Sequence, residues 1–82
     1  MEIKNDWQEK DNMLVKEYKF SDFKSAVEFV NKVAQVAESI NHHPDILIYS
    51  YKNVRISTAT HEESKITEKD YELAELIDKI ES

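Results

Sequence analysis

The chain has 82 residues and a formal net charge of −6, from 17 acidic against 11 basic side chains. This acidic balance argues against direct binding to nucleic acid, which depends on a basic face. Cysteine and glycine are both absent, which excludes disulfides, thiolate metal sites and the glycine-rich loops that cradle phosphates. No apolar run approaches the roughly 18 residues that span a membrane, so we expect a single cytoplasmic domain over residues 1–82.

The first predicted elements lie in residues 7–20. Residues 7–12 are polar apart from Trp7, which is typical of a short strand or a loop. In residues 13–20, apolar side chains recur imperfectly on one parity, at Leu14, Tyr18 and Phe20. This alternation predicts a β-strand.

A long amphipathic helix is predicted next. Ser21 is its predicted N-cap, with Asp22 in the first turn, where the helix dipole favours an acidic side chain. Pro44 disfavours helical geometry at His43, so the helix should end near Asn41 or His42. Apolar residues recur at three- and four-residue spacing, at Phe23, Ala26, Val27, Val30, Val33, Ala34, Ala37 and Ile40.

Residues 46–51 and 54–60 are rich in β-branched and aromatic side chains and are predicted to form a β-hairpin. Residues 51–53 would connect the two strands, with Asn53 in the left-handed conformation. In the second strand, one face is predicted to carry Val54, Ile56 and Thr58.

A second helix is predicted after Thr67, its N-cap, with Asp70 in the capping-box position. Its apolar residues are Tyr71, Leu73, Ala74, Leu76, Ile77 and Ile80. The element order is therefore β-β-α-β-β-α. This order predicts an α+β fold, an antiparallel four-stranded sheet with two helices packed on one face.

The three histidines are the candidates for chemistry. His42 and His43 lie where the first helix ends, and His61 lies where the second hairpin strand ends. Because a hairpin brings the start of one strand beside the end of the next, all three imidazoles should reach one rim of the sheet. Glu38 precedes His42 by four residues, which puts both on one helical face if the last turn holds.

Three interpretations of these histidines remain open from the residues alone. Paired histidines at a helix end can be capping or surface residues that the helix dipole favours. Three histidines can bind zinc, although adjacent residues of an extended segment point to opposite sides, which disfavours joint ligation by His42 and His43. Imidazoles can also serve as general acid and base on a small polar substrate.

The segment from Glu38 through Asn41, His42 and His43 to Pro44 resembles the E-x-x-x-H-H-P signature of the pterin-4a-carbinolamine dehydratases. The similarity extends over roughly residues 7–80 and includes residues 18–23, the Thr-His-Glu at residues 60–62, and the helix start at residues 66–70. The chain departs from the family's pattern at residues 63–65, where a glycine is usual, and in a slightly longer hairpin.

The resemblance implies a hydro-lyase that dehydrates 4a-hydroxytetrahydropterin to quinonoid dihydropterin, without a metal or a cofactor. The reaction recycles tetrahydrobiopterin after aromatic amino acid hydroxylation. His42 and His61 would form the acid–base pair, in either order, and Glu38 would orient His42. The implied substrate-binding residues are His43, Asn41, Pro44, Asp45 and Thr60, of which Asn41, Pro44 and Asp45 would also shape the turn.

The resemblance also implies the partners. These are a pterin substrate and at least a homodimer formed through the sheet, with dimers of dimers formed through the helices. Neither nucleic acid nor a membrane is expected. The alternative function is a non-catalytic module that stabilises dimers of a transcription factor, through helix and sheet-edge surfaces and not through the histidines.

Overall fold

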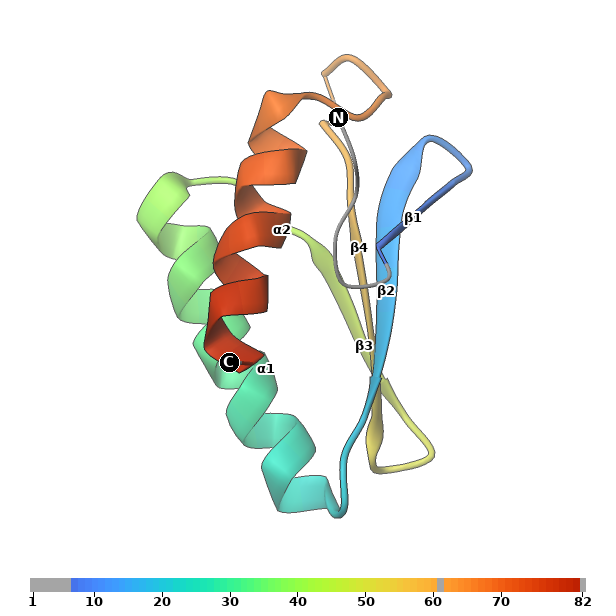
Figure 1. Ribbon diagram of the computed structural model, residues 1–82, viewed down its shortest axis with the longest axis vertical. Coiled ribbons are helices and arrows are strands. Elements are labelled where there is room, and N and C mark those ends of the chain that lie inside the picture. The colour runs from blue at the N-terminus through green and yellow to red at the C-terminus, as the bar shows by residue number, and fades with distance from the viewer. Residues whose placement is uncertain (1–6, 61, 82) are drawn as a thin grey trace.

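The structure, a computed structural model, describes residues 7–60 and 62–81. Its elements follow in the order β1 (Gln8–Lys10), β2 (Met13–Lys19), α1 (Phe23–Ile40), β3 (Asp45–Tyr49), β4 (Asn53–Thr58) and α2 (Glu68–Glu81). The strands form one antiparallel sheet in the order β1-β2-β4-β3, and both helices cover the same face of it (Figure 1). The predicted α+β fold is confirmed.

The core lies between the sheet and the helices, because inward and outward side chains alternate along each strand. β4 is central: it pairs with residues 14–19 of β2 on one side and with the whole of β3 on the other. The predicted grouping of Val54, Ile56 and Thr58 on one face is confirmed, and this face points inward, since all three residues are buried. The buried apolar residues are Trp7, Leu14, Ala26, Phe29, Val33, Ala37, Val54, Ile56, Leu73, Ala74 and Ile77.

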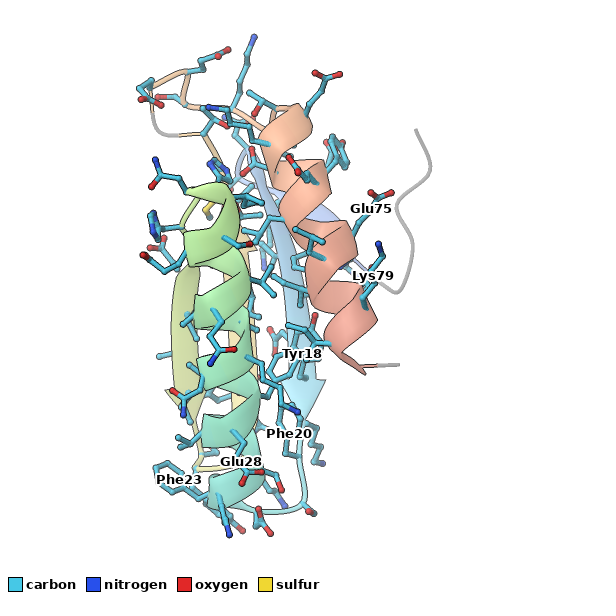
Figure 2. The ribbon with its side chains drawn as sticks, turned by 90° about the vertical axis from the view of Figure 1, so that its left-hand side faces the viewer. Tyr18, Phe20, Phe23, Glu28, Glu75 and Lys79 are labelled. Carbon is cyan, nitrogen blue, oxygen red and sulfur yellow. The ribbon has the colours of Figure 1, made fainter. Side chains whose placement is uncertain are left out.

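The predicted apolar stripe of α1 is only partly buried, since Phe23 and Ala34 are exposed. Phe29, which the stripe did not include, is buried, and its ring centroid lies 4.6 Å from that of Tyr18 and 5.1 Å from that of Phe20. Figure 2 shows Tyr18 between the two helices and Phe20 beyond the end of α2. A hollow of about 640 Å³ lies here, and none of the predicted site residues lines it.

The N-terminal cap of α1 differs from the prediction. Asp22, and not Ser21, is the N-cap: its backbone is extended, with φ of −157°, and its Oδ1 accepts the N–H of Ser25 at 2.8 Å. A carboxylate both accepts this bond and interacts favourably with the positive end of the helix dipole, which accounts for the choice. The other end is as predicted, because the helix ends at Ile40 and Asn41 follows.

The β3–β4 hairpin also turns at residues other than those predicted. Tyr49 ends β3 and pairs with Asn53, and the left-handed residues are Ser50 (φ 48°) and Tyr51 (φ 54°). Asn53 is instead extended in β4, where it pairs with both neighbouring strands. Two consecutive left-handed residues give the turn the twist that matches the strands beside it.

The start of α2 confirms the predicted capping box. Oγ1 of Thr67 accepts the N–H of Lys69 at 3.3 Å, and Oδ2 of Asp70 accepts the N–H of Thr67 at 2.9 Å. This end of α2 lies at the same end of the molecule as the last turn of α1 and the end of β4 (Figure 1). Within residues 7–60 and 62–81, neither helix has the length and apolar character needed to cross a membrane.

Candidate functional site

A Schellman motif fixes the backbone of His42 at the end of α1. The N–H of His42 donates to the carbonyl of Ala37 at 3.1 Å, and the N–H of Asn41 donates to the carbonyl of Glu38 at 3.2 Å. These are the two bonds that define the motif. Asn41 adopts the left-handed conformation the motif requires, with φ of 53°, which its short polar side chain tolerates. The chain therefore leaves the helix in a defined direction.

His42 and His43 lie in different surroundings, as adjacent residues of an extended segment should. The side chain of His42 is 11% exposed and contacts α2, whereas that of His43 is 54% exposed. Within residues 7–60 and 62–81, no group of three or more histidine, aspartate and glutamate side chains is arranged to hold a metal ion. The structure thus separates the two imidazoles.

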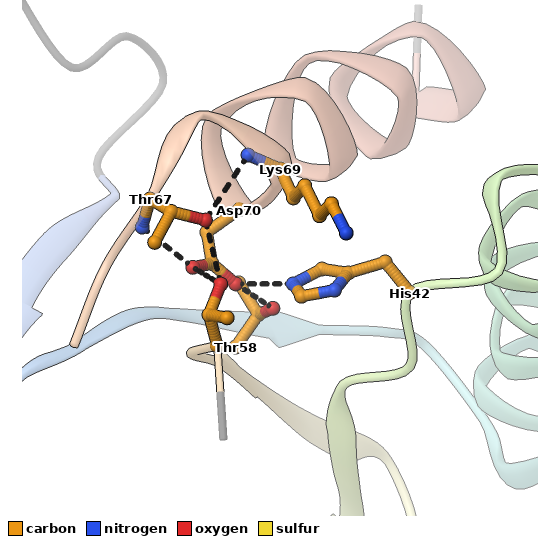
Figure 3. A network of polar contacts seen from close by, with 6 residues as sticks. His42, Thr58, Thr67, Lys69 and Asp70 are labelled. Carbon is orange, nitrogen blue, oxygen red and sulfur yellow. Dashed lines mark hydrogen bonds and ion pairs between the residues drawn. The ribbon is translucent and has the colours of Figure 1, made fainter. Parts of the chain in front are cut away.

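A hydrogen bond joins His42 to Asp70, 28 positions later in the first turn of α2 (Figure 3). Nε2 of His42 lies 2.6 Å from Oδ1 of Asp70, and Asp70 has no exposed surface. The same Oδ1 accepts the hydroxyl of Thr58 at 2.6 Å. Oδ2 accepts the N–H of Thr67 at 2.9 Å and the hydroxyl of Thr60 at 3.1 Å. Each oxygen has two lone pairs, so the carboxylate is fully hydrogen-bonded.

The surroundings of Asp70 determine whether Asp70 or His42 carries the proton in the hydrogen bond between them. Burial raises the pKa of Asp70, but the hydrogen bonds from Thr58, His42, Thr67 and Thr60 outweigh it and hold that pKa below its ordinary value of 3.8. Asp70 is therefore ionised at neutral pH and can only accept hydrogen bonds. Nε2 of His42 must carry the shared proton, which leaves Nδ1 to exchange a proton with another molecule.

Glu38 contacts His43 and not His42. Its Oε2 lies 2.6 Å from Nε2 of His43, at an exposed position where such a pair contributes little to stability. The predicted contact between Glu38 and His42 is wrong, because the helix ends at Ile40 and four-residue helical spacing does not continue past it. The left-handed Asn41 redirects the chain, so that His42 reaches Asp70 and His43 reaches Glu38.

The remaining predicted site residues lie near this turn or at the end of β4. Asn41 and Asp45 are exposed and Pro44 is half-buried. Thr60 is 5% exposed, and its hydroxyl lies between the carboxylate of Asp70 and the hydroxyl of Thr67, facing the buried network. His61 lies outside the described residues, so its position at this rim stays a prediction.

Sequence reasoning missed Asp70 and Thr58 as site residues. The capping box accounts for one oxygen of Asp70 and gives no sign that the other reaches a histidine. A signal was nevertheless present in β4, where Thr58 follows Val54 and Ile56 on the buried face. Because buried hydroxyls are almost always hydrogen-bonded, a threonine at such a position indicates a buried polar partner.

Comparisons with known proteins agree over nearly the whole chain. The sequence profile described as "Pterin 4 alpha carbinolamine dehydratase" matches residues 1–80. A protein of Sulfolobus acidocaldarius is 44% identical over 75 residues, which cover 92% of this chain and 81% of that protein. One of Herpetosiphon aurantiacus is 45% identical over 80 residues, which cover 98% and 82%. Both are named, provisionally, as pterin-4-alpha-carbinolamine dehydratases.

Solved structures have the same fold. A transcriptional coactivator/pterin dehydratase from Brucella melitensis is 34% identical, with a TM-score of 0.82 over 90% of this chain and 80% of that one. A pterin dehydratase-like protein described as a RuBisCO assembly factor in the alpha-carboxysome is 23% identical, with a TM-score of 0.71 over 92% and 88%, and shares the fold. The profile match and the identity to its relatives show that the chain belongs to the pterin-4a-carbinolamine dehydratase family.

Proposed function

We propose that this protein is a hydro-lyase that dehydrates 4a-hydroxytetrahydropterin to quinonoid dihydropterin by histidine general acid–base catalysis, so that the pterin can be used again. The observation that carries the proposal is the hydrogen bond from His42 to the buried, ionised Asp70. A carboxylate that fixes one ring nitrogen and leaves the other to react is how enzymes orient an imidazole for proton transfer. Family membership supports a pterin as the substrate.

The reaction is a loss of water that needs two proton transfers and involves no change of oxidation state. The C4a–O bond breaks, its electron pair leaves with the hydroxyl oxygen, and a general acid protonates that oxygen to give water. A general base takes the proton from N5, and the electron pair of the N5–H bond becomes the second bond of C4a=N5. The acid gives one proton and the base gains one, so a pair of imidazoles can perform both steps.

We assign one of the two transfers to Nδ1 of His42, because Asp70 holds Nε2. The other is assigned to His61 on the strength of the family resemblance. His43, held by Glu38, would bind the pterin. The turn formed by Asn41, Pro44 and Asp45 would border the substrate, and the buried Thr60 would support the site through Asp70.

Stopped-flow measurement of carbinolamine dehydration tests this proposal. His42→Ala and His61→Ala should each lower kcat by on the order of 10²-fold or more, the usual contribution of a general acid or base. Lys24→Ala, at the exposed start of α1, is the control and should keep the wild-type rate. Wild-type rates in both histidine variants, or no turnover by the wild-type protein, would show the assignment to be wrong.

We also propose that the chain forms at least a homodimer. β1 pairs only with residues 13–15 of β2, so among the described residues no strand pairs with the rest of that edge of β2 or with the outer edge of β3. Unpaired strand edges favour association with another strand. Light scattering at micromolar concentration should give at least twice the mass of the chain, and a monomer alone would contradict this proposal.

A further inference from the structure

Thr58 places a hydroxyl group where the rest of its strand face is apolar. It is the last residue of β4, is 1% exposed, and follows Val54 and Ile56 on the buried face. Valine would fill nearly the same volume without a hydroxyl, and burying a hydroxyl is unfavourable unless it is hydrogen-bonded. The compensating bond runs from Oγ1 of Thr58 to Oδ1 of Asp70 at 2.6 Å.

Thr58 and His42 bind the same oxygen of Asp70, each at 2.6 Å (Figure 3). The other oxygen is held at the start of α2 by the N–H of Thr67 and beyond the end of β4 by the hydroxyl of Thr60. The carboxylate cannot rotate about its Cβ–Cγ bond without losing bonds on both sides. These contacts therefore fix the direction in which Oδ1 accepts a proton from the imidazole.

The hydroxyl groups of this network have one consistent direction of donation. The N–H of Lys69 donates to Oγ1 of Thr67, which lies 2.6 Å from Oγ1 of Thr60. Because the carboxylate of Asp70 only accepts, Thr60 donates its single proton to Oδ2 of Asp70, 3.1 Å away. The Thr67 hydroxyl must then be the donor in its bond to Thr60. Since each hydroxyl carries one proton, neither can also supply Oδ1. Thr58 is thus the hydroxyl that shares Oδ1 with His42.

We propose that Thr58 is a positioning residue: by fixing Oδ1 of Asp70, it holds His42 in the Nε2–H tautomer and keeps Nδ1 available to the substrate. The kinetic consequence rests on the proposed function, whereas the tautomer of His42 can be measured without a substrate. A threonine that only fills the core would affect stability and leave both the tautomer and kcat unchanged.

Three variants test the role of the hydroxyl. Thr58→Val removes it at constant shape and should lower kcat by about tenfold, the size expected for one lost hydrogen bond to a charged group, with little change in KM. Thr58→Ser restores the hydroxyl and should recover most of the wild-type kcat. Ile56→Val alters the same buried strand face away from Asp70 and should keep the wild-type kcat.

Nitrogen NMR of protein labelled with ¹⁵N-histidine supplies the second measurement, with His42→Ala to assign the signals. The wild-type protein and T58S should show the Nε2–H tautomer. T58V should show a mixture of tautomers, because without the bond from Thr58 the Oδ1 atom of Asp70 can turn away from Nε2. Wild-type kcat and an unchanged His42 signal in T58V would overturn the proposal, as would an equal loss in T58S. If T58V does not fold, Thr58→Ala is judged by the same criteria. If the wild-type protein does not turn over the pterin, the proposed function fails, while the tautomer still decides the role of Thr58.

Discussion

Asp70 has two tasks: it caps α2 and it orients His42. Replacing it by asparagine should distinguish the loss of these tasks from a general loss of core packing. Asparagine keeps the shape of the side chain but exchanges one accepting oxygen for an amide that donates. In either orientation, the NH₂ group of the amide faces two donors whose hydrogen bonds the carboxylate accepts in the native protein. These are His42 and Thr58 on one side, or Thr60 and the N–H of Thr67 on the other.

The loss of stability can be estimated from those contacts. Leaving a buried donor without an acceptor costs about 1 to 3 kcal/mol, and the two hydroxyls can relieve part of this by rotating. We therefore expect Asp70→Asn to lower the free energy of unfolding by about 2 to 4 kcal/mol. For a domain of this size, that corresponds to a fall in Tm of roughly 10 to 30 °C.

The expected loss of activity is larger than stability alone would produce. Without an ionised acceptor, His42 is no longer restricted to the Nε2–H tautomer, and kcat should fall by on the order of 10²-fold. Asp78→Asn is the matched control on the same helix, because Asp78 holds Trp7 at 3.0 Å and the buried Lys16 at 3.3 Å, away from His42. Exchanging this carboxylate for a neutral amide weakens a largely buried ion pair, so D78N should also lose stability.

Circular dichroism melting curves and stopped-flow rates, recorded well below the lower Tm, provide the comparison. We expect D78N to lose stability and keep kcat, and D70N to lose both. If the two variants lose kcat equally, the effect of Asp70 is a general loss of packing. If D70N keeps the wild-type kcat, Asp70 does not orient a reacting imidazole.

Two further predictions concern ionised groups. In the folded state burial raises the pKa of Asp70, but the stronger effect of its hydrogen bonds holds that pKa below 3.8. Its contribution to stability is therefore complete above the unfolded-state pKa and is lost as the pH falls through the lower folded-state value. Urea midpoints should be level above about pH 5 and fall below about pH 4, and D70N should lack this part of the fall. Glu38→Gln should change the free energy of unfolding by less than about 0.5 kcal/mol and raise KM only a few-fold, because the bond between Glu38 and His43 is exposed. A loss of kcat as large as that of H42A would instead return Glu38 to the role of orienting His42.

Local patterns were enough to predict the fold. Alternation in the strands, the three- and four-residue spacing of the helices and the capping box at Thr67 all involve residues close in sequence. The errors arose where two such signals competed. At the start of α1, Asp22 is the N-cap in place of Ser21. In the hairpin, Asn53 pairs within the sheet, and Ser50 and Tyr51 adopt the left-handed conformation of the turn.

The candidate site was harder to predict, because its decisive contact spans 28 positions. The sequence indicates that His42 follows a helix end, but only the packing of α2 against α1 brings Asp70 to it. The partner of Glu38 depends on one backbone conformation, the left-handed Asn41, which brings His43 to Glu38 in place of the expected His42. Spacing rules for a continuous helix do not apply beyond such a residue.

The shared use of Asp70 limits how this protein can evolve. Glutamate and glutamine are the usual residues at N3, the last position of a capping box, so optimising the cap of α2 alone would favour Asp70→Glu. The added methylene group would displace the carboxylate from His42, Thr58 and Thr60, which contact it directly. The helix cap and the buried network therefore make different demands on the length of this side chain. An engineer who improves the helix cap should expect to lose turnover.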